Sequence, residues 1–141
     1  MRKRTQAREY ALQILYQIDV RNDPEDKILV DFWKNIETEP EISDFAAKLV
    51  IGTIRNKKKI DEMISKYASN WKLSRMAVID RNVLRMAAYE LLYCEDIPPK
   101  VSINEAVDLA KKFGDTESGK FVNGILDKIN KTEDRSKRRG V

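Results

Sequence analysis

The chain of 141 residues contains no histidine and only one cysteine, Cys94. The absence of histidine removes the most common general base and most zinc ligand sets. A single cysteine cannot form a disulfide within the chain, and without a histidine to activate it Cys94 is expected to be a structural thiol. Glycine-rich phosphate loops and paired metal-binding carboxylates are also missing. The sequence therefore predicts no metal, no cofactor and no enzymatic activity.

Long hydrophobic runs are absent as well. No apolar stretch approaches the roughly 20 residues that span a membrane. The basic N-terminus leads into an amphipathic segment and lacks the hydrophobic region of a signal peptide. Hydrophobic residues make up 42% of the chain and charged residues 35%, as in a soluble globular domain. We therefore expect a cytoplasmic protein with no membrane partner.

Positive charge is concentrated at the two ends of the chain. Residues 1–8 contain four basic residues and no acidic one, while residues 131–141 contain five basic residues and two acidic ones. Because the net charge of the whole chain is +4, residues 9–130 are slightly acidic. Such ends fit contact with phosphate groups, although basic tails also serve only to solubilise proteins. We expect residues 1–130 to form one folded domain and residues 131–141 a disordered basic tail.

Apolar residues recur mainly at helical spacing, and no segment alternates as a β-strand would. The segment from Ser74 to Tyr93 is apolar nearly all round, which is typical of a buried central helix. The sequence predicts an all-α, single-domain bundle of about seven helices, and a division into two halves near Asn70 stays open. The predicted helices cover about residues 5–20, 24–36, 43–55, 57–67, 74–93, 102–113 and 120–131.

Capping signals suggest where these helices begin and end. Residues 102–105 match a capping box at the start of a helix, and Gly114 is expected to end that same helix. The last helix is predicted to open with Lys120 and Phe121. Free N–H groups at a helix start attract phosphate, and an aromatic ring beside them can stack on an unpaired base. Together with the basic N-terminus, this helix start indicates RNA binding.

Three side chains of this hypothesis have competing interpretations. Tyr16 lies nearly opposite the apolar stripe of the first helix, so a surface contact explains it better than the core does. Phe121 lies at the rim of the last helix's apolar stripe and could belong to the core. Lys120 could be an ordinary solvated lysine.

Four motifs resemble the NusB family of transcription antitermination factors. They are residues 7–16, 80–91, 103–107 and 119–127, and the resemblance extends over about residues 2–130. It implies an all-helical fold that binds the single-stranded boxA segment of nascent ribosomal RNA. The implied protein partner is NusE, a protein of the small ribosomal subunit. In the transcription elongation complex, the pair helps RNA polymerase to read through terminators during ribosomal RNA synthesis.

The resemblance and the chemistry of the side chains together assign residues to each surface. Asp80 and Arg81 correspond to family positions at the contact with NusE. Glu117, next to the RNA site, is expected to weaken binding because its carboxylate repels phosphate. The expected RNA-binding residues are Arg2, Lys3, Arg4, Arg8, Tyr16, Lys120 and Phe121.

Two other functions remain as alternatives. NusB-like helical domains also occur as the RNA-contacting part of ribosomal RNA cytosine methyltransferases, but here no cofactor domain or catalytic cysteine motif follows. A protein-binding helical adaptor with solubilising ends is the second alternative, and it predicts negligible RNA affinity. The sequence is also compatible with a homodimer of the free protein.

Overall fold

The computed structural model describes residues 2–133, and this part of the chain contains seven α-helices, one short 3-10 helix (η1) and no strand. The predicted all-α bundle of about seven helices is confirmed. None of the helices in residues 2–133 is both long and apolar enough to cross a membrane. The elements are α1 (Arg2–Val20), α2 (Glu25–Trp33), α3 (Pro40–Arg55), α4 (Lys57–Tyr67), η1 (Leu73–Arg75), α5 (Val78–Tyr93), α6 (Pro99–Phe113) and α7 (Thr116–Thr132).

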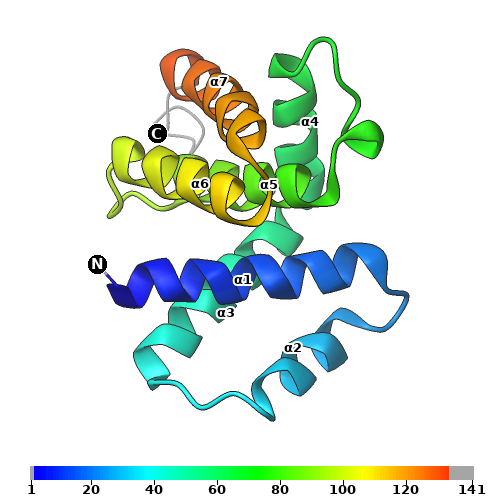
Figure 1. Ribbon diagram of the computed structural model, residues 1–141, viewed down its shortest axis with the longest axis vertical. Coiled ribbons are helices and arrows are strands. Elements are labelled where there is room, and N and C mark those ends of the chain that lie inside the picture. The colour runs from blue at the N-terminus through cyan, green and yellow to red at the C-terminus, as the bar shows by residue number, and fades with distance from the viewer. Residues whose placement is uncertain (1, 134–141) are drawn as a thin grey trace.

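The helices form two groups with α5 between them (Figure 1). Helices α1, α2 and α3 make one group, in which α1 packs against both α2 and α3. Helices α4, α6 and α7 make the other, in which α6 packs along α7. Because α3 and α4 meet at Asn56, the division between the groups lies there and not near Asn70.

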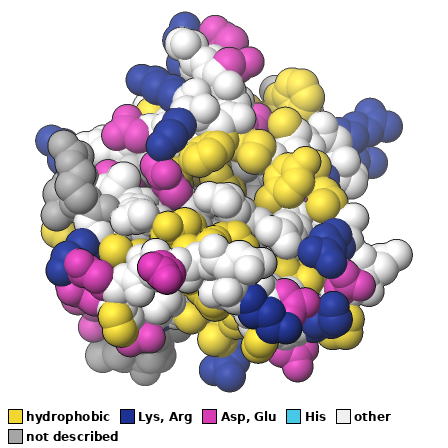
Figure 2. Space-filling model, turned by 60° about the horizontal axis from the view of Figure 1, so that its bottom comes forward, with side chains coloured by type: hydrophobic (Ala, Val, Ile, Leu, Met, Phe, Trp, Pro, Cys, Tyr) yellow, Lys and Arg dark blue, Asp and Glu magenta, His cyan; other side chains and the backbone are white. Residues whose placement is uncertain are grey.

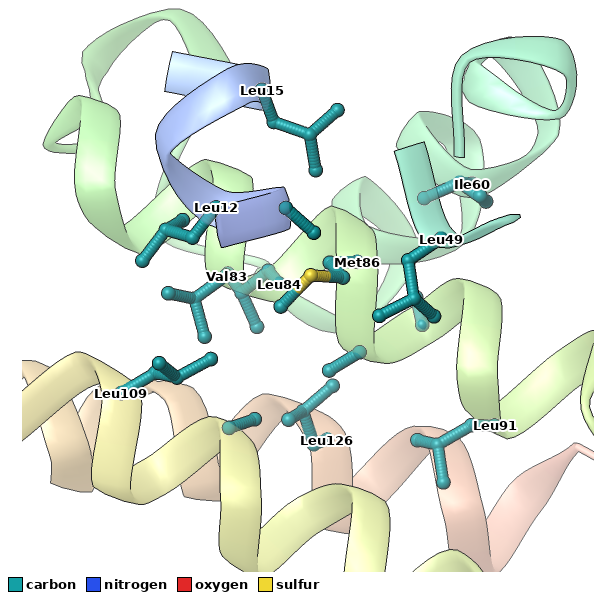
Figure 3. Close-up of a cluster of buried hydrophobic side chains, with 14 of the residues drawn as sticks. Leu12, Leu15, Leu49, Ile60, Val83, Leu84, Met86, Leu91, Leu109 and Leu126 are labelled. Atoms are coloured by element: carbon teal, nitrogen blue, oxygen red, sulfur yellow. The ribbon is translucent and has the colours of Figure 1, made fainter. Parts of the chain in front are cut away.

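Helix α5 is the central helix that its apolar pattern predicts. Ten of its sixteen residues are buried, so it contacts neighbours on most of its circumference. Figure 3 shows Leu84 and Met86 of α5 among side chains from the surrounding helices. Cys94 follows α5 and is buried, as expected of a structural thiol, and this burial raises the pKa of the thiol. Helix α5 therefore packs directly against α1, α3, α4, α6 and α7.

Several predicted helix starts are wrong by a few residues. Helix α6 begins at Pro99 and α3 at Pro40, because proline fits the first turn, where its missing N–H costs nothing. Ser102 consequently lies inside α6, where its buried hydroxyl donates to Glu90 at 2.8 Å and makes no cap. Similarly, α5 begins four residues after Ser74, which belongs to η1. The predicted helix end is confirmed, since Gly114 caps α6.

Candidate RNA interface

The first turn of α1 presents two of the predicted RNA-binding residues at the surface. The Lys3 Nζ lies 2.9 Å from Glu39 and 3.1 Å from Glu41, and these hydrogen bonds raise the pKa of the lysine. An Arg4 guanidinium nitrogen lies 3.6 Å from Asp96. About half of each basic side chain is exposed, so a phosphate can reach both. It would compete there with carboxylates that the protein already supplies.

Arg8 does not lie on this surface, which contradicts the prediction that it binds phosphate. Only 2% of the residue is exposed, and its guanidinium pairs with Glu90 at 2.8 Å and Glu105 at 3.1 Å. Burial opposes its charge, but the two carboxylates outweigh that effect and raise the pKa of Arg8. The charge of Arg8 is therefore neutralised inside the protein.

The amino end of α7 also differs from the prediction. The helix begins at Thr116, and its cap is Asp115, whose Oδ1 accepts a hydrogen bond of 2.8 Å from the Ser118 N–H. Lys120 therefore lies in the second turn and not at the free N–H groups of a helix start. The phosphate attraction predicted from a helix start at Lys120 is wrong. Its exposed ammonium group remains available and lies 3.6 Å from Glu117.

Two predicted aromatic residues differ in exposure. Tyr16 is 40% exposed on the polar face of α1, as its position in the helical pattern predicts. Phe121 packs partly against the core, and its ring meets Trp71 edge-on with the centroids 6.0 Å apart. Trp71 is 55% exposed, and the sequence reasoning did not assign it to the site. Its position between helices, outside any apolar stripe, was the signal that could have revealed it.

Helix α6 connects the two predicted RNA-binding regions. Arg4 pairs with Asp96 just before α6 begins, while Lys112 near its end donates to Glu9 of α1 at 2.8 Å. Helix α7 starts three residues after α6 ends (Figure 1). Fifteen helical residues span about 22 Å, so α6 forms an edge of about that length between Asp96 and the start of α7. Because Lys112 pairs with Glu9, five residues along α1 from Arg4, one strand that follows this edge could contact both regions.

The molecular surface carries charges of both signs. On the face in Figure 2, hydrophobic side chains lie near the centre, and basic and acidic side chains alternate around them. Positive charge on this face is therefore interrupted by carboxylates. The basic residues of 134–141 and the side chain of Arg2 lie outside the described residues.

Asp80 and Phe121 line one pocket of about 420 Å³ between α5 and α7. Trp71, Arg75 and Glu117 are also among its lining residues. Within residues 2–133, the Asp80 Oδ1 is buried and has no hydrogen-bond partner. Burial raises the pKa of Asp80, and the charge of Asp115 adds to this effect, whereas a hydrogen bond with Ser118 opposes it. A cationic group entering this pocket would find an acceptor already desolvated.

Arg81, the other residue predicted at the protein partner, is held by Asp19 of α1. Its Nε and one terminal nitrogen donate to the two Asp19 oxygens at 2.7 and 3.0 Å. This bidentate pair joins the first turn of α5 to the last turn of α1. Only 17% of the Arg81 side chain is exposed, so most of it serves this internal contact.

These features define a class of small all-α protein whose surface combines exposed basic side chains, carboxylates and partly exposed aromatic rings. The NusB family model matches residues 5–131, and the chain belongs to the NusB family. It is 52% identical over 128 residues to the transcription antitermination protein NusB of Anaeromyxobacter dehalogenans (strain 2CP-1), covering 90% of this chain and 89% of that protein. Over 130 residues it is 45% identical to the transcription antitermination protein NusB of Bacillus cereus (strain B4264), covering 92% and 98%. The predicted family is confirmed.

Solved structures show the same fold. The chain is similar to T. maritima NusB, with a TM-score of 0.86, 37% identity and coverage of 98% of this chain and 97% of that chain. It is also similar to a chain in the crystal structure of the antitermination factors NusB and NusE in complex with dsRNA. That match has a TM-score of 0.85, 33% identity and coverage of 94% and 99%.

Proposed function

We propose that this protein is a transcription antitermination factor of the cytoplasm and not an enzyme. In this proposal it binds the boxA segment of nascent ribosomal RNA together with NusE and acts in the transcription elongation complex. The observation that carries the proposal is the match, over nearly the whole chain, to a structure of NusB and NusE with dsRNA. The exposed cations and aromatic rings along α1, α6 and α7 supply suitable chemistry.

Lys3, Arg4 and Lys120 would contact phosphates at the two ends of this edge. Their present carboxylate partners are exposed, and exposed ion pairs are weak, so RNA phosphates can replace them at little cost. Arg2 belongs to the same proposal through its position in the first turn of α1. Each phosphate contact would make the affinity more sensitive to salt.

Tyr16 and Phe121 would contact unpaired bases by stacking. Both rings are at least partly accessible, and stacking suits single-stranded RNA because its bases are not covered by partners. Trp71 continues the aromatic surface beyond Phe121. The two rings lie on different helices, so a bound strand would pass from α1 toward α7.

The first turn of α5 would contact NusE. Asp80 lines the pocket and has a buried carboxylate oxygen, Oδ1, while Arg81 holds this turn against α1. A basic side chain of the partner could pair with the Asp80 carboxylate, which has no carboxylate-neutralising cation among the partners described for residues 2–133. This is why we assign the direct contact chiefly to Asp80.

An RNA-binding titration with boxA and with a scrambled RNA of the same composition tests the proposal. We expect the protein to prefer boxA and NusE to strengthen that binding. Equal, weak affinity for both RNAs, with and without NusE, would instead support a purely protein-binding adaptor. Repeating the titration at two protein concentrations shows whether a homodimer competes with RNA.

One observation bears on the methyltransferase alternative. The chain covers 89% and 98% of the lengths of the two relatives above, and both of these are named antitermination proteins. The match therefore extends over most of the length of two proteins that are named antitermination proteins. We accordingly favour antitermination.

A further inference from the structure

Arg8 makes the most extensive buried ionic contact at the amino end of α1. Its Nε and one terminal nitrogen donate to the two Glu90 oxygens at 2.9 and 2.8 Å. The other terminal nitrogen donates to Glu105 at 3.1 Å. All three guanidinium nitrogens therefore have carboxylate partners, and RNA cannot reach them.

Two hydroxyl groups extend this contact. Ser102 of α6 donates to Glu90 at 2.8 Å, and Thr5 of α1 donates to Glu105 at 2.7 Å. The network thus joins α1, α5 and α6 at one point. Because a guanidinium fork binds a carboxylate in one plane, it fixes the rotation of α1 as well as its distance from α5.

Arg4 lies one helical turn before Arg8 on the same face of α1. The two guanidinium carbons lie 4.3 and 5.5 Å, respectively, from the centroid of the same Phe45 ring. Arg4 is half exposed, whereas Arg8 is buried beneath the surface. A small rotation of α1 about its axis would therefore move Arg4 away from Phe45 and change where its charge lies.

We propose that Arg8 is a positioning residue for RNA binding. It makes no contact with RNA and holds α1 in the rotation that presents Arg4, and with it Lys3, to the phosphates. This inference rests on the proposed function, because it needs RNA to bind at the amino end of α1. It assigns Glu90 and Glu105 the same role, as the carboxylates that hold Arg8.

Two variants separate this role from a direct contact. Arg8→Lys keeps the charge but loses the fork, so a direct phosphate contact would be largely retained while the positioning would be lost. For Glu90→Gln, the two roles predict opposite changes in RNA affinity. If Arg8 bound RNA, removing its competing carboxylate would tighten binding, whereas loss of positioning must weaken it.

The experiment is a titration of the full chain with boxA RNA at several salt concentrations, with folding checked by circular dichroism. We expect Arg8→Lys and Glu90→Gln each to weaken binding about 3- to 30-fold, which lies within the range of coupling between residues in contact. In an Arg4→Ala background the effect of Arg8→Lys should become much smaller, because the residue to be positioned is gone. Unchanged or tighter binding by Glu90→Gln overturns the inference.

Arg85→Lys is the matched control. Arg85 is also buried and ion-paired, but it pairs with Asp19 and Asp61, away from the amino end of α1. We expect it to bind RNA within twofold of the unmodified protein. An equal loss in this control would make the Arg8 effect a general consequence of destabilisation and overturn the inference.

If Glu90→Gln does not fold, Ser102→Ala removes only one hydroxyl from the network and should still weaken binding. Normal RNA affinity of Ser102→Ala would then contradict the positioning role.

Failure of the unmodified chain to prefer boxA would contradict the proposed function itself. If instead the unmodified chain prefers boxA and the variants bind it equally well, only the positioning role is contradicted.

Discussion

Asp80 and Phe121 line the same pocket, although the sequence assigns one to a protein partner and the other to RNA. They belong to α5 and α7, so the two proposed contacts would lie across one helix interface. A base at Phe121 and a cationic side chain at Asp80 would consequently be neighbours. This arrangement gives a physical basis for RNA and NusE to strengthen each other's binding, because each would desolvate the other's contact.

Phe121→Leu should weaken boxA binding by about 1–3 kcal/mol, the contribution of one stacked base, because leucine keeps the apolar contact with the core but has no ring. The dependence of affinity on salt should stay unchanged, since no charge is removed. Titrations at several salt concentrations measure both quantities. Phe32→Leu, at another partly buried ring with an edge contact, is the control and should bind normally.

Lys120→Ala tests whether the lysine beside Phe121 contacts an RNA phosphate. We expect the slope of log affinity against log salt to fall by about 0.7, the value for one phosphate contact on a single strand. The same titration series provides the slope. An unchanged slope would mean that Lys120, despite its exposure, contacts no phosphate.

Glu117→Gln should tighten RNA binding by roughly 1.5- to 5-fold, a range set by the weakness of exposed charge interactions. The substitution removes a negative charge 3.6 Å from the Lys120 ammonium group and leaves that group to phosphate. Competition binding against the unmodified protein measures the change. Glu62→Gln, which removes an exposed charge from α4, is the control. Weaker RNA binding by Glu117→Gln would instead show that the Glu117 carboxylate accepts a hydrogen bond that RNA binding needs.

Asp80→Lys should impair pairing with NusE at least tenfold, since it places a cation where we expect the partner's cation, and like charges at an interface cost several kcal/mol. Isothermal titration with purified NusE measures the affinity, and circular dichroism shows whether the fold is retained. Asp26→Lys makes the same charge change on the exposed side of α2. Normal pairing by Asp80→Lys would place the interface elsewhere.

Acid should weaken the contact between α1 and α5. Burial opposes ionisation of Asp19, but hydrogen bonds from Arg81 and Asn82 outweigh it and lower the pKa of the carboxyl. The stability from this lowered pKa is fully present above the unfolded value of about 3.9 and is lost as the pH falls through the folded value. Asp19→Asn should therefore cost about 1–3 kcal/mol at pH 7 and progressively less on acidification. Denaturant unfolding at pH 7 and pH 3 tests this, with Asp44→Asn on α3 as the control.

Helical periodicity located all seven helices because it records burial, and burial in a bundle repeats with the helical turn. The starts of the helices were less predictable. Ser102 and Lys120 looked like first residues, yet proline and Asp115 begin these helices earlier. A capping residue reveals its role only when the backbone conformation before it is known.

The candidate site shows a different limit. Lys3, Arg4 and Tyr16 were correctly expected at the surface from charge and from the polar face of α1. Arg8 was not, because its partners Glu90 and Glu105 lie more than 80 residues away in sequence. A basic residue beside other basic residues suggests a surface patch, and only the packing of three helices shows that it is buried.

Arg85 is shared by carboxylates from two helices, with its Nε 2.9 Å from Asp61 of α4 and a terminal nitrogen 3.1 Å from Asp19 of α1. Opening of either helix would therefore leave the buried guanidinium of Arg85, on α5, with only one of its two carboxylate partners. We expect amide protons in the last turns of α1 and the first turns of α4 to exchange with solvent at matching rates, as one cooperative unit spanning both helix groups.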